Sequence, residues 1–299
     1  RTFEDYEILE ELSRSATAVV FKAREVSLDR IVALKVLPRG LFVGDEEMAR
    51  LQGEAAVIAR LDHPNILPIY DLGELAHQPY FSMRFVAGAS LAGRIGEFFG
   101  RPKRIGMLVE KVARALHFAH GQGVLHLRLE PGNILIDQGG EPFVTDFHPP
   151  EFGAGSLLAA AVACLAPEQV REESVDERTD VYGLGAVLFH LLTGGPPFAE
   201  ANTYDTLKGV VEQSPRALTP ADEGLAAISR KCLSKEKDRR YASAGQLADD
   251  LANWRTGKPL TATENAFVPS QGAWLPRKWF GGGATIAVAA ALAAASRLL

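Results

Sequence analysis

The hydrophobic pattern of this chain is mostly that of β-strands up to about residue 86 and becomes helical from Ser90 onward, and that change limits the possible folds more than any other feature. Before it, residues 4–12, 18–25, 31–37, 63–74 and 79–86 are rich in β-branched and aromatic residues and read as five strands. Residues 45–60 interrupt them with helical spacing, and Asp45 is placed to cap that helix. The first part of the chain is therefore predicted to be a sheet with one helix.

The second part of the chain is predicted to be helical. Residues 111–123, 225–233 and 243–257 have amphipathic spacing, and residues 180–194 are apolar nearly throughout, which predicts a buried helix. A β-rich part followed by a helical part favours an α+β protein of two lobes with a cleft between them. We expect the β-rich lobe at residues 1–85 and the helical lobe at residues 86–257.

The C-terminal part differs in composition from the rest. Residues 258–276 are rich in Pro, Gly, Thr, Ser and Asn, and are predicted to be a linker. The stretch from Trp279 to Ser296 is apolar and follows the basic pair Arg277 and Lys278, which predicts a transmembrane helix at residues 279–298 that keeps residues 1–276 in the cytoplasm. The alternative is an alanine-rich soluble helix. The small residues would let two membrane helices approach closely, so a homodimer is also considered.

Charge and cysteine content exclude some classes. The net charge of −5 and the pI near 5.9 argue against a protein that coats nucleic acid. Only two cysteines, Cys164 and Cys232, are present, which is too few for a disulfide framework and favours a reducing compartment.

Short motifs in a fixed order identify a family. VALK ends at Lys35, HLRLEPGN ends at Asn133, TDF contains Asp146, APE ends at Glu168, and RRY contains Arg240. Together they resemble the protein kinases over about residues 5–257, and in particular the bacterial transmembrane serine/threonine kinases. The resemblance implies the bilobal protein-kinase fold, ATP and Mg²⁺ as cofactors, and phosphoryl transfer to a hydroxyl group.

The resemblance also implies a role for individual residues. Lys35 would contact the α- and β-phosphates and be held by Glu54, while Asn133 and Asp146 would bind the metal. The residues expected around the nucleotide are Ser13, Ser15, Ala18, Val20, Ala33, Lys35, Met83, Phe85 and Leu135, with Met83 at the back of the adenine site. Glu168 and Arg240 would form a buried ion pair with a structural role.

The phosphate-covering loop departs from the family pattern G-x-G-x-x-G. Ser13, Ser15 and Ala18 stand where the family has glycine. Glycine allows the backbone to approach phosphate closely and to adopt unusual dihedral angles, so three side chains there are expected to weaken nucleotide binding.

The catalytic loop departs further from the family pattern H-R-D-L-K-P-x-N. Arg128 occupies the position of the aspartate general base, and Glu130 that of the lysine that contacts the γ-phosphate. Arginine stays protonated and cannot accept a proton, while a carboxylate near phosphate is repulsive. Leu127 replaces the arginine that receives an activation-loop phosphate, and His148 replaces the glycine after Asp-Phe.

We therefore expect a membrane-anchored serine/threonine-kinase homologue that is catalytically impaired, with weak or no binding of Mg-ATP. It would act as a scaffold or regulator whose partners are signalling proteins, for instance an active kinase. The alternative is an active kinase with rearranged catalytic residues, because Lys35, Glu54, Asn133 and Asp146 are all retained. A specific hypothesis is that Arg128 lies near Asp146 and Glu130 and supplies the positive charge of the metal.

Overall fold

The computed structural model describes residues 2–3, 5–15, 18–37, 53, 56–75, 78–147, 162–216 and 222–264. It divides into a β-rich unit and a helical unit. The β-rich unit comprises Arg1–Arg94, Ala115–His126 and Pro131–Pro149, and the helical unit comprises Ile95–Arg114, Leu127–Glu130 and Pro150–Leu299. The chain thus passes between the units several times, whereas the sequence analysis expected one boundary, at residue 85.

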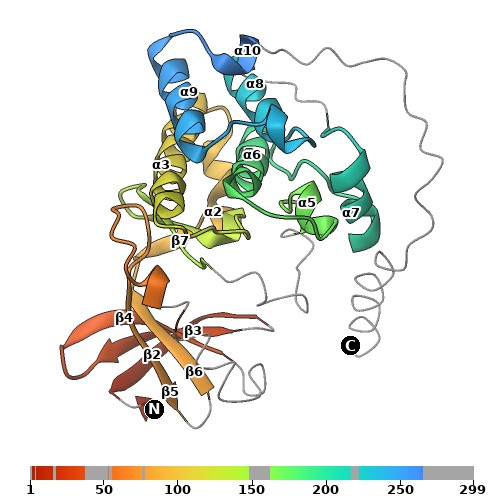
Figure 1. Ribbon diagram of the computed structural model, residues 1–299. Helices are drawn as coiled ribbons and strands as arrows, with labels where there is room; N and C mark the ends of the chain where they lie inside the picture. The colour runs from red at the N-terminus through yellow and green to blue at the C-terminus, as the bar shows by residue number, and fades with distance from the viewer. Residues whose placement is uncertain are drawn as a thin grey trace. The chain divides into compact units, whose positions relative to one another are not determined.

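The β-rich unit is built on an antiparallel sheet in the order β1-β2-β3-β4-β6-β5 (Figure 1). Its strands are β1 (Thr2–Phe3), β2 (Tyr6–Arg14), β3 (Val19–Glu25), β4 (Arg30–Val36), β5 (Ile69–Leu75) and β6 (Gln78–Arg84). The sheet has one more strand than the five predicted, because the short β1 pairs with the start of β2. The predicted strand at 63–74 begins only at Ile69, since Pro64 and Pro68 interrupt the segment before it.

Strand alternation gives this sheet two different faces. Val32, Leu34 and Val36 of β4 pack on one face with Tyr6 and Tyr80. Their neighbours Ala33 and Lys35 lie on the other face, where Ala33 joins an apolar cluster that contains Met83 and Phe143. The single lysine of β4 is thereby placed on the same face as the predicted adenine residues.

A second, three-stranded sheet lies in the same unit. It consists of β7 (Gly88–Ser90), β8 (Ile134–Asp137) and β9 (Pro142–Val144), in that order. The short helices α2 (Leu91–Arg94) and η2 (Pro131–Asn133) flank it. Asn133 therefore comes directly before β8, and Asp146 comes shortly after β9, so the hairpin brings the two chain segments together.

The helical unit contains most of the helices that the structure describes. They are η1 (Ile95–Phe98), most of α3 (Pro102–Gly121), α5 (Pro167–Val170), α6 (Glu177–Thr193), α7 (Thr203–Glu212), α8 (Glu223–Cys232), η3 (Lys237–Arg239), α9 (Ala244–Thr256) and α10 (Thr261–Glu264). The predicted helices at 180–194, 225–233 and 243–257 are confirmed. Helix α3 begins at Pro102, well before the predicted start at Lys111, and α7, which Asn202 caps, was not predicted.

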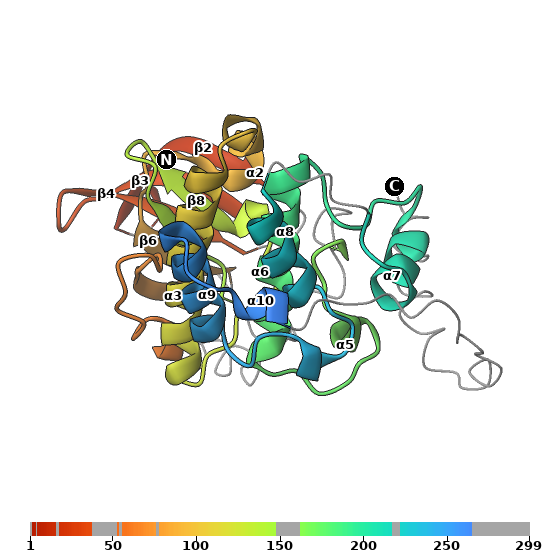
Figure 2. The same cartoon turned by 90° about the horizontal axis from the view of Figure 1, so that it is seen from above.

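Helix α6 is buried on nearly every side, as predicted. Asp176 caps its start by accepting a hydrogen bond from the backbone of Arg178, and Gly194 ends it with a left-handed φ of 79°. Gly185 lets α8 approach, because a Cβ atom there would lie 2.3 Å from the Cβ of Cys232. Helices α3 and α9 run side by side, with ion pairs Arg114–Asp249 and Arg255–Glu110 between them (Figures 1 and 2).

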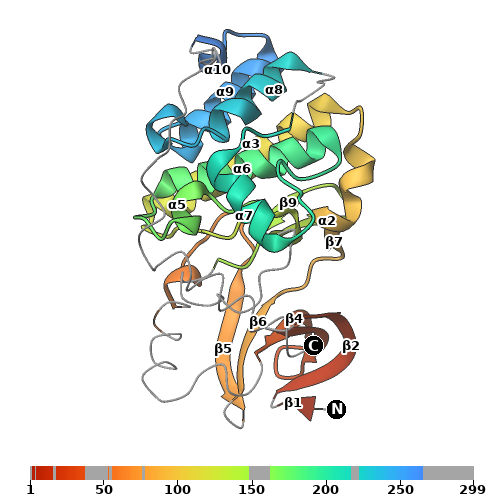
Figure 3. The same cartoon turned by 90° about the vertical axis from the view of Figure 1, so that its right-hand side faces the viewer.

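The chain stays folded past residue 257, where the sequence analysis placed the start of the linker. Asp250 is buried and accepts hydrogen bonds from the backbone of Thr261 and Ala262, at 2.9 Å each, so that α10 is held against α9. The position of α10 beside α8 and α9 is visible in Figure 3. The hydrogen bonds extend the folded part to at least residue 262.

Two predicted helices cannot be compared with the structure in full. The predicted transmembrane helix at 279–298 lies outside the described residues, as does the linker from residue 265 onward. Among the residues that are described, no helix has the length and apolar content needed to cross a membrane. Of the helix predicted at 45–60, the structure describes only residue 53 and residues 56–60, with helix at 53 and 56–58.

Candidate functional site

Lys35 and Asp146 meet in the β-rich unit, although they are far apart in the sequence. The ammonium of Lys35 donates to Oδ1 of Asp146 at 2.6 Å, and the two side chains are 11% and 28% exposed. The lysine is on β4, and the aspartate follows β9. A phosphate-binding lysine and a metal-binding aspartate would need this proximity, because both act on one triphosphate.

Several of the residues predicted around the adenine ring gather in one apolar cluster on the face of the sheet that carries Ala33. Ala33 and Met83 are 8% exposed, and Val20 and Leu135 pack against them with Phe143. Phe85 is half-buried, and the ammonium of Lys22 lies 5.0 Å from the centre of its ring. The side chains form a largely apolar surface, on which the flat ring of a nucleotide base could stack.

The loop between β2 and β3 is closed by its own serine. The Oγ of Ser15 accepts a hydrogen bond from the backbone N–H of Ala18 at 3.1 Å and donates to the carbonyl of Ala18 at 3.2 Å. A third bond joins the backbone N–H of Ser15 to the same carbonyl at 2.9 Å. The N–H of Ala18, which could otherwise point to a phosphate oxygen, is therefore occupied. Ser13 lies further back, exposed on β2.

Asn133 and Asp146 offer oxygen donors of the kind that Mg²⁺ prefers. The backbone N–H of Thr145 donates to the carbonyl of Asn133 at 3.0 Å and so fixes the two segments beside each other. Asp146 has a left-handed φ of 62°, which is uncommon for a residue other than glycine. One carboxylate and one amide fit a metal that takes its other ligands from phosphate and water, so these residues could hold Mg²⁺ once Asp146 is released from Lys35.

His126 supports this arrangement from the core. It is fully buried, its Nε2 lies 3.0 Å from the carbonyl oxygen of Thr145, and its ring packs 4.8 Å from that of Phe147. The contacts fix the backbone on both sides of Asp146. A left-handed φ such as that of Asp146 persists only where the surrounding structure fixes the backbone, and the buried His126 does this here.

The segment 127–130 belongs to the helical unit and is fixed through its backbone. The N–H of Leu127 donates to the buried carboxylate of Asp180 at 2.6 Å, and its carbonyl accepts from Nε2 of Gln169 at 2.7 Å. Leu127, with a left-handed φ of 62°, and Leu129 are buried. Arg128 and Glu130 alternate with them and are half-buried.

The sequence analysis did not assign a role to Asp180 or Gln169. A signal was available for Asp180, because it is a charged residue at the start of an otherwise apolar helix. No such signal exists for Gln169, whose partners lie 42 residues away on the backbone of Leu127 and three residues away at Ala166. Only the folded chain shows that these two side chains hold the loop that carries Arg128.

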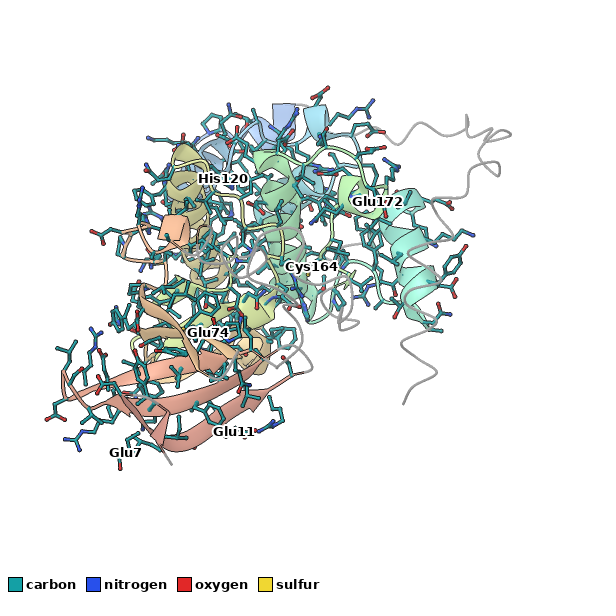
Figure 4. The ribbon with its side chains drawn as sticks, turned by 60° about the horizontal axis from the view of Figure 1, so that its bottom comes forward. Glu7, Glu11, Glu74, His120, Cys164 and Glu172 are labelled. Atoms are coloured by element: carbon teal, nitrogen blue, oxygen red, sulfur yellow. The ribbon has the colours of Figure 1, made fainter. Side chains whose placement is uncertain are left out.

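The predicted ion pair between Glu168 and Arg240 is confirmed. Both oxygens of Glu168 accept from the guanidinium, at 2.7 and 2.8 Å, and the side chains are 2% and 0% exposed. Burial opposes the ionised form of Glu168, but the hydrogen bonds and charge of Arg240 outweigh it and lower the pKa. Cys164, which is labelled in Figure 4, is also buried in the helical unit. Burial raises the pKa of its thiol, and the carboxylate of Glu130 adds to the shift.

Other predicted residues lie outside the description. Glu54, expected to hold Lys35, and His148, the replacement for glycine, are not among the described residues, and neither is Ser156. Arg128 belongs to the helical unit and Asp146 to the β-rich unit. Glu54 and the Arg128 hypothesis therefore remain predictions.

The fold and these residues define a protein kinase domain. The family model for the protein kinase domain matches residues 6–264, and the chain belongs to that family. It is of the bacterial serine/threonine type. It is 33% identical over 259 residues to the DNA damage-responsive serine/threonine-protein kinase RqkA of Deinococcus radiodurans, covering 81% of this chain and 38% of the relative. It is 34% identical over 274 residues to the serine/threonine-protein kinase PknB of Mycobacterium tuberculosis, covering 86% and 44%.

The similarity extends to solved structures. The PknI kinase domain of Mycobacterium tuberculosis superposes with a TM-score of 0.69 at 28% identity, covering 85% of this chain and 98% of that one. By contrast, the chain spans less than half the length of the curated relatives RqkA and PknB. The family implies the use of ATP and Mg²⁺.

Proposed function

We propose that this chain is a membrane-anchored serine/threonine-kinase homologue with strongly impaired phosphoryl transfer, acting as a scaffold or regulator. The observation that carries the proposal is Arg128 in a loop whose backbone is fixed at Leu127 by Asp180 and Gln169. In the family this loop position holds the aspartate that accepts the proton of the incoming hydroxyl. A guanidinium has no lone pair available for that proton.

The charge of the second replaced residue acts in the same direction. Glu130 stands where the family has a lysine that contacts the γ-phosphate. A carboxylate there repels phosphate oxygens, and the effect is larger in a partly buried site than in water. Loss of a general base by itself lowers the rate by about 10²–10⁴-fold.

Weak nucleotide binding is part of the proposal. The N–H of Ala18, which would bind phosphate, donates to the hydroxyl of Ser15. The carboxylate of Asp146, which would bind the metal, accepts from Lys35. A nucleotide must displace these partners before it gains its own contacts. We also propose that Arg128 lies near Asp146 and Glu130 and supplies the positive charge of the metal.

An active kinase is the second candidate. Lys35, Asn133 and Asp146 are present, and the first and last meet at 2.6 Å. Positioning and charge stabilisation supply much of the catalysis of phosphoryl transfer, so a slow reaction without the base is chemically possible. The two candidates differ in whether the wild-type chain transfers phosphate at a rate that depends on Lys35.

A reversion experiment distinguishes them. The full chain is assayed with γ-labelled ATP, Mg²⁺ and a generic protein substrate, as wild type, Lys35→Met, and the double variant Arg128→Asp/Glu130→Lys. We expect wild type and Lys35→Met to transfer labelled phosphate at the same background rate, and the double variant to transfer it faster. Wild-type transfer that Lys35→Met abolishes would establish the active kinase instead.

Nucleotide binding is measured separately by a thermal-shift titration with Mg-ATP. A native-state ligand raises the unfolding temperature as its concentration rises. We expect little or no rise at millimolar Mg-ATP in wild type. A saturable rise that Asp146→Asn removes would contradict weak binding, whatever the transfer assay shows.

Membrane anchoring and partners rest on the sequence alone. Residues 279–298, which are apolar as far as Ser296 and follow Arg277 and Lys278, would anchor the chain with the kinase domain in the cytoplasm, and a second copy could pair through the small residues. Signalling proteins, for instance an active kinase, are the proposed partners. Recovery of the full chain in the carbonate-washed membrane fraction, and of residues 1–264 in the supernatant, would support the anchor.

A further inference from the structure

A basic and apolar surface patch lies where helix α3 begins. We call it the α3 patch, and it consists of Phe99, Arg101, Lys103, Arg104 and Met107, all in the helical unit. Phe99 is 53% exposed and Met107 is 49% exposed, although both side chains are large and apolar. The segment 95–107 holds three basic residues and a single acidic one, Glu97. The patch thus presents apolar side chains among an excess of positive charge.

The fold fixes the turn that carries the patch. The backbone N–H of Arg101 donates to the carbonyl oxygen of Phe98 at 3.0 Å and closes the turn before α3. Phe98 is buried, and the guanidinium of Arg104 lies 4.6 Å from its ring centre. Phe99 lies against the end of α6, where a Cβ atom on Gly194 would come 2.3 Å from its ring. The turn is therefore anchored in the core by Phe98, while about half of Phe99 stays exposed.

The cations of the patch lie where the helix dipole disfavours them. Arg101 directly precedes α3, and Lys103 and Arg104 belong to its first turn, which has no acidic residue. The N-terminal end of a helix carries a partial positive charge, so cations there destabilise the helix. Glu97 pairs with Arg104 at 3.4 Å, but among the described residues Arg101 and Lys103 have no side-chain partner. A charge placement that costs stability without a contact inside the chain favours a role in binding.

We propose that the α3 patch binds the anionic surface of a membrane. Apolar side chains among Lys and Arg are typical of protein surfaces at the lipid–water interface, where the apolar groups enter the acyl boundary and the cations attract anionic lipids. An acidic protein segment would also attract the cations, but the proposed membrane anchor, on which this role rests, keeps the bilayer close. Residues 265–278, which precede the predicted membrane helix, span at most about 50 Å when extended. Tethering of this kind lets weak contacts act, because docking becomes intramolecular.

The number of cations sets the strength of the contact. Each Lys or Arg near an anionic surface strengthens association by about fivefold. Arg101→Glu/Lys103→Glu should therefore weaken docking by more than about 25-fold, because each change removes an attraction and adds a repulsion. The same changes place carboxylates at the start of α3, which the helix dipole favours, so the variant should be at least as stable as wild type. Loss of binding without loss of stability would separate this role from a structural one.

Oxidation of Met107 in the full chain tests the proposal. The chain is mixed with vesicles of phosphatidylcholine alone, or of equal parts of phosphatidylcholine and phosphatidylglycerol. Oxidation by hydrogen peroxide is followed by mass spectrometry, with the buried Met83 as the internal reference. We expect Met107 to be oxidised more slowly on the anionic vesicles by at least about fivefold, the effect of one surface cation. In Arg101→Glu/Lys103→Glu the rate should be the same on both kinds of vesicle.

The matched control is Lys208→Glu/Arg239→Glu. Lys208 is on α7 and Arg239 is on η3, and both are exposed. The control changes the net charge by the same amount as the variant of the patch, so it measures the effect of overall charge. We expect the control to keep the slow oxidation of Met107 on the anionic vesicles.

The proposal would be overturned by equal oxidation rates of wild type on the two kinds of vesicle, or by protection of Met107 that survives Arg101→Glu/Lys103→Glu. Protection by soluble polyglutamate but not by the anionic vesicles would overturn it as well and would assign the patch to an acidic protein. Sedimentation of the chain with vesicles of phosphatidylcholine alone, which carry no net charge, reports the anchor. Failure of the anchor is thereby distinguished from failure of the patch.

Discussion

The buried pair of Glu168 and Arg240 allows a quantitative prediction of stability. Replacing Glu168 by Ala leaves a guanidinium that is 0% exposed without its carboxylate. Its other hydrogen-bond partners among the described residues are the backbone carbonyls of Arg178 at 3.0 Å, Ser234 at 2.8 Å and Lys235 at 3.1 Å. These carbonyls, and the ring of Tyr182 whose centre lies 4.9 Å away, carry no net charge to neutralise the guanidinium. Removing one partner of a buried ion pair costs about 3–5 kcal/mol.

That cost is large enough to measure by calorimetry. For a domain of this size, 1 kcal/mol lowers the unfolding temperature by about 2–4 °C, so Glu168→Ala should lower it by about 6–20 °C. The matched control is Asp249→Ala, which removes an exposed pair with Arg114, whose partners are 67% and 42% exposed. The control should cost less than about 1 kcal/mol. Equal losses in the two variants would refute the reasoning.

The pH dependence of this pair has a definite sign. Because the pKa of Glu168 is lowered below its ordinary value of 4.5, the pair stabilises the protein above that value. The contribution is lost as the pH falls through the lowered pKa. The difference between wild type and Glu168→Ala should therefore be largest near neutral pH and shrink in acid.

Two further predictions concern helix α6. Asp176→Ala should lower the free energy of unfolding by about 1–2 kcal/mol, because it removes the helix cap. The hydrogen bond from Arg178 lowers the pKa of Asp176 to about 2, so the difference from wild type in urea unfolding should become smaller between pH 4 and pH 2. A difference that stays constant over this range would contradict the assignment of Asp176 as the cap. Gly185→Ala should lower the free energy of unfolding by about 1–3 kcal/mol, because its Cβ would lie 2.3 Å from that of Cys232. Gly121→Ala is the control in the same urea titration, because a Cβ there would meet no neighbouring atom within 4 Å. Equal stability of the two variants would contradict the predicted clash.

The elements with a strong period were predictable, and those defined by capping or pairing were less so. The apolar run of α6 and the amphipathic helices α8 and α9 were located within a few residues, because their spacing repeats over several turns. Helix α7 was missed, because it is short and has Gly209 near its end. The start of α3 was missed, because Pro102 reads as a break although proline is tolerated in the first turn.

In the candidate site, too, some features could be read from the sequence and others appear only in the structure. The types of residue at positions 35, 128, 130, 133 and 146 are visible in the sequence, and the proposed impairment of catalysis rests on the arginine at 128 and the glutamate at 130. The side chains that contact these residues in the folded protein cannot be read from the sequence. Asp180 and Gln169 reach Leu127 across long stretches of chain, and the hydroxyl of Ser15 turns back on Ala18.

The sequence by itself determined the family, the two kinds of secondary structure and the chemical identity of each group in the loop, because these depend on periodicity and on which atoms a side chain carries. Only the tertiary structure decided that Lys35 meets Asp146 and that Glu168 meets Arg240. The physical reason is that charge, burial and proton affinity depend on distances between residues that are remote in the chain. Chain folding sets those distances, and no local pattern records them.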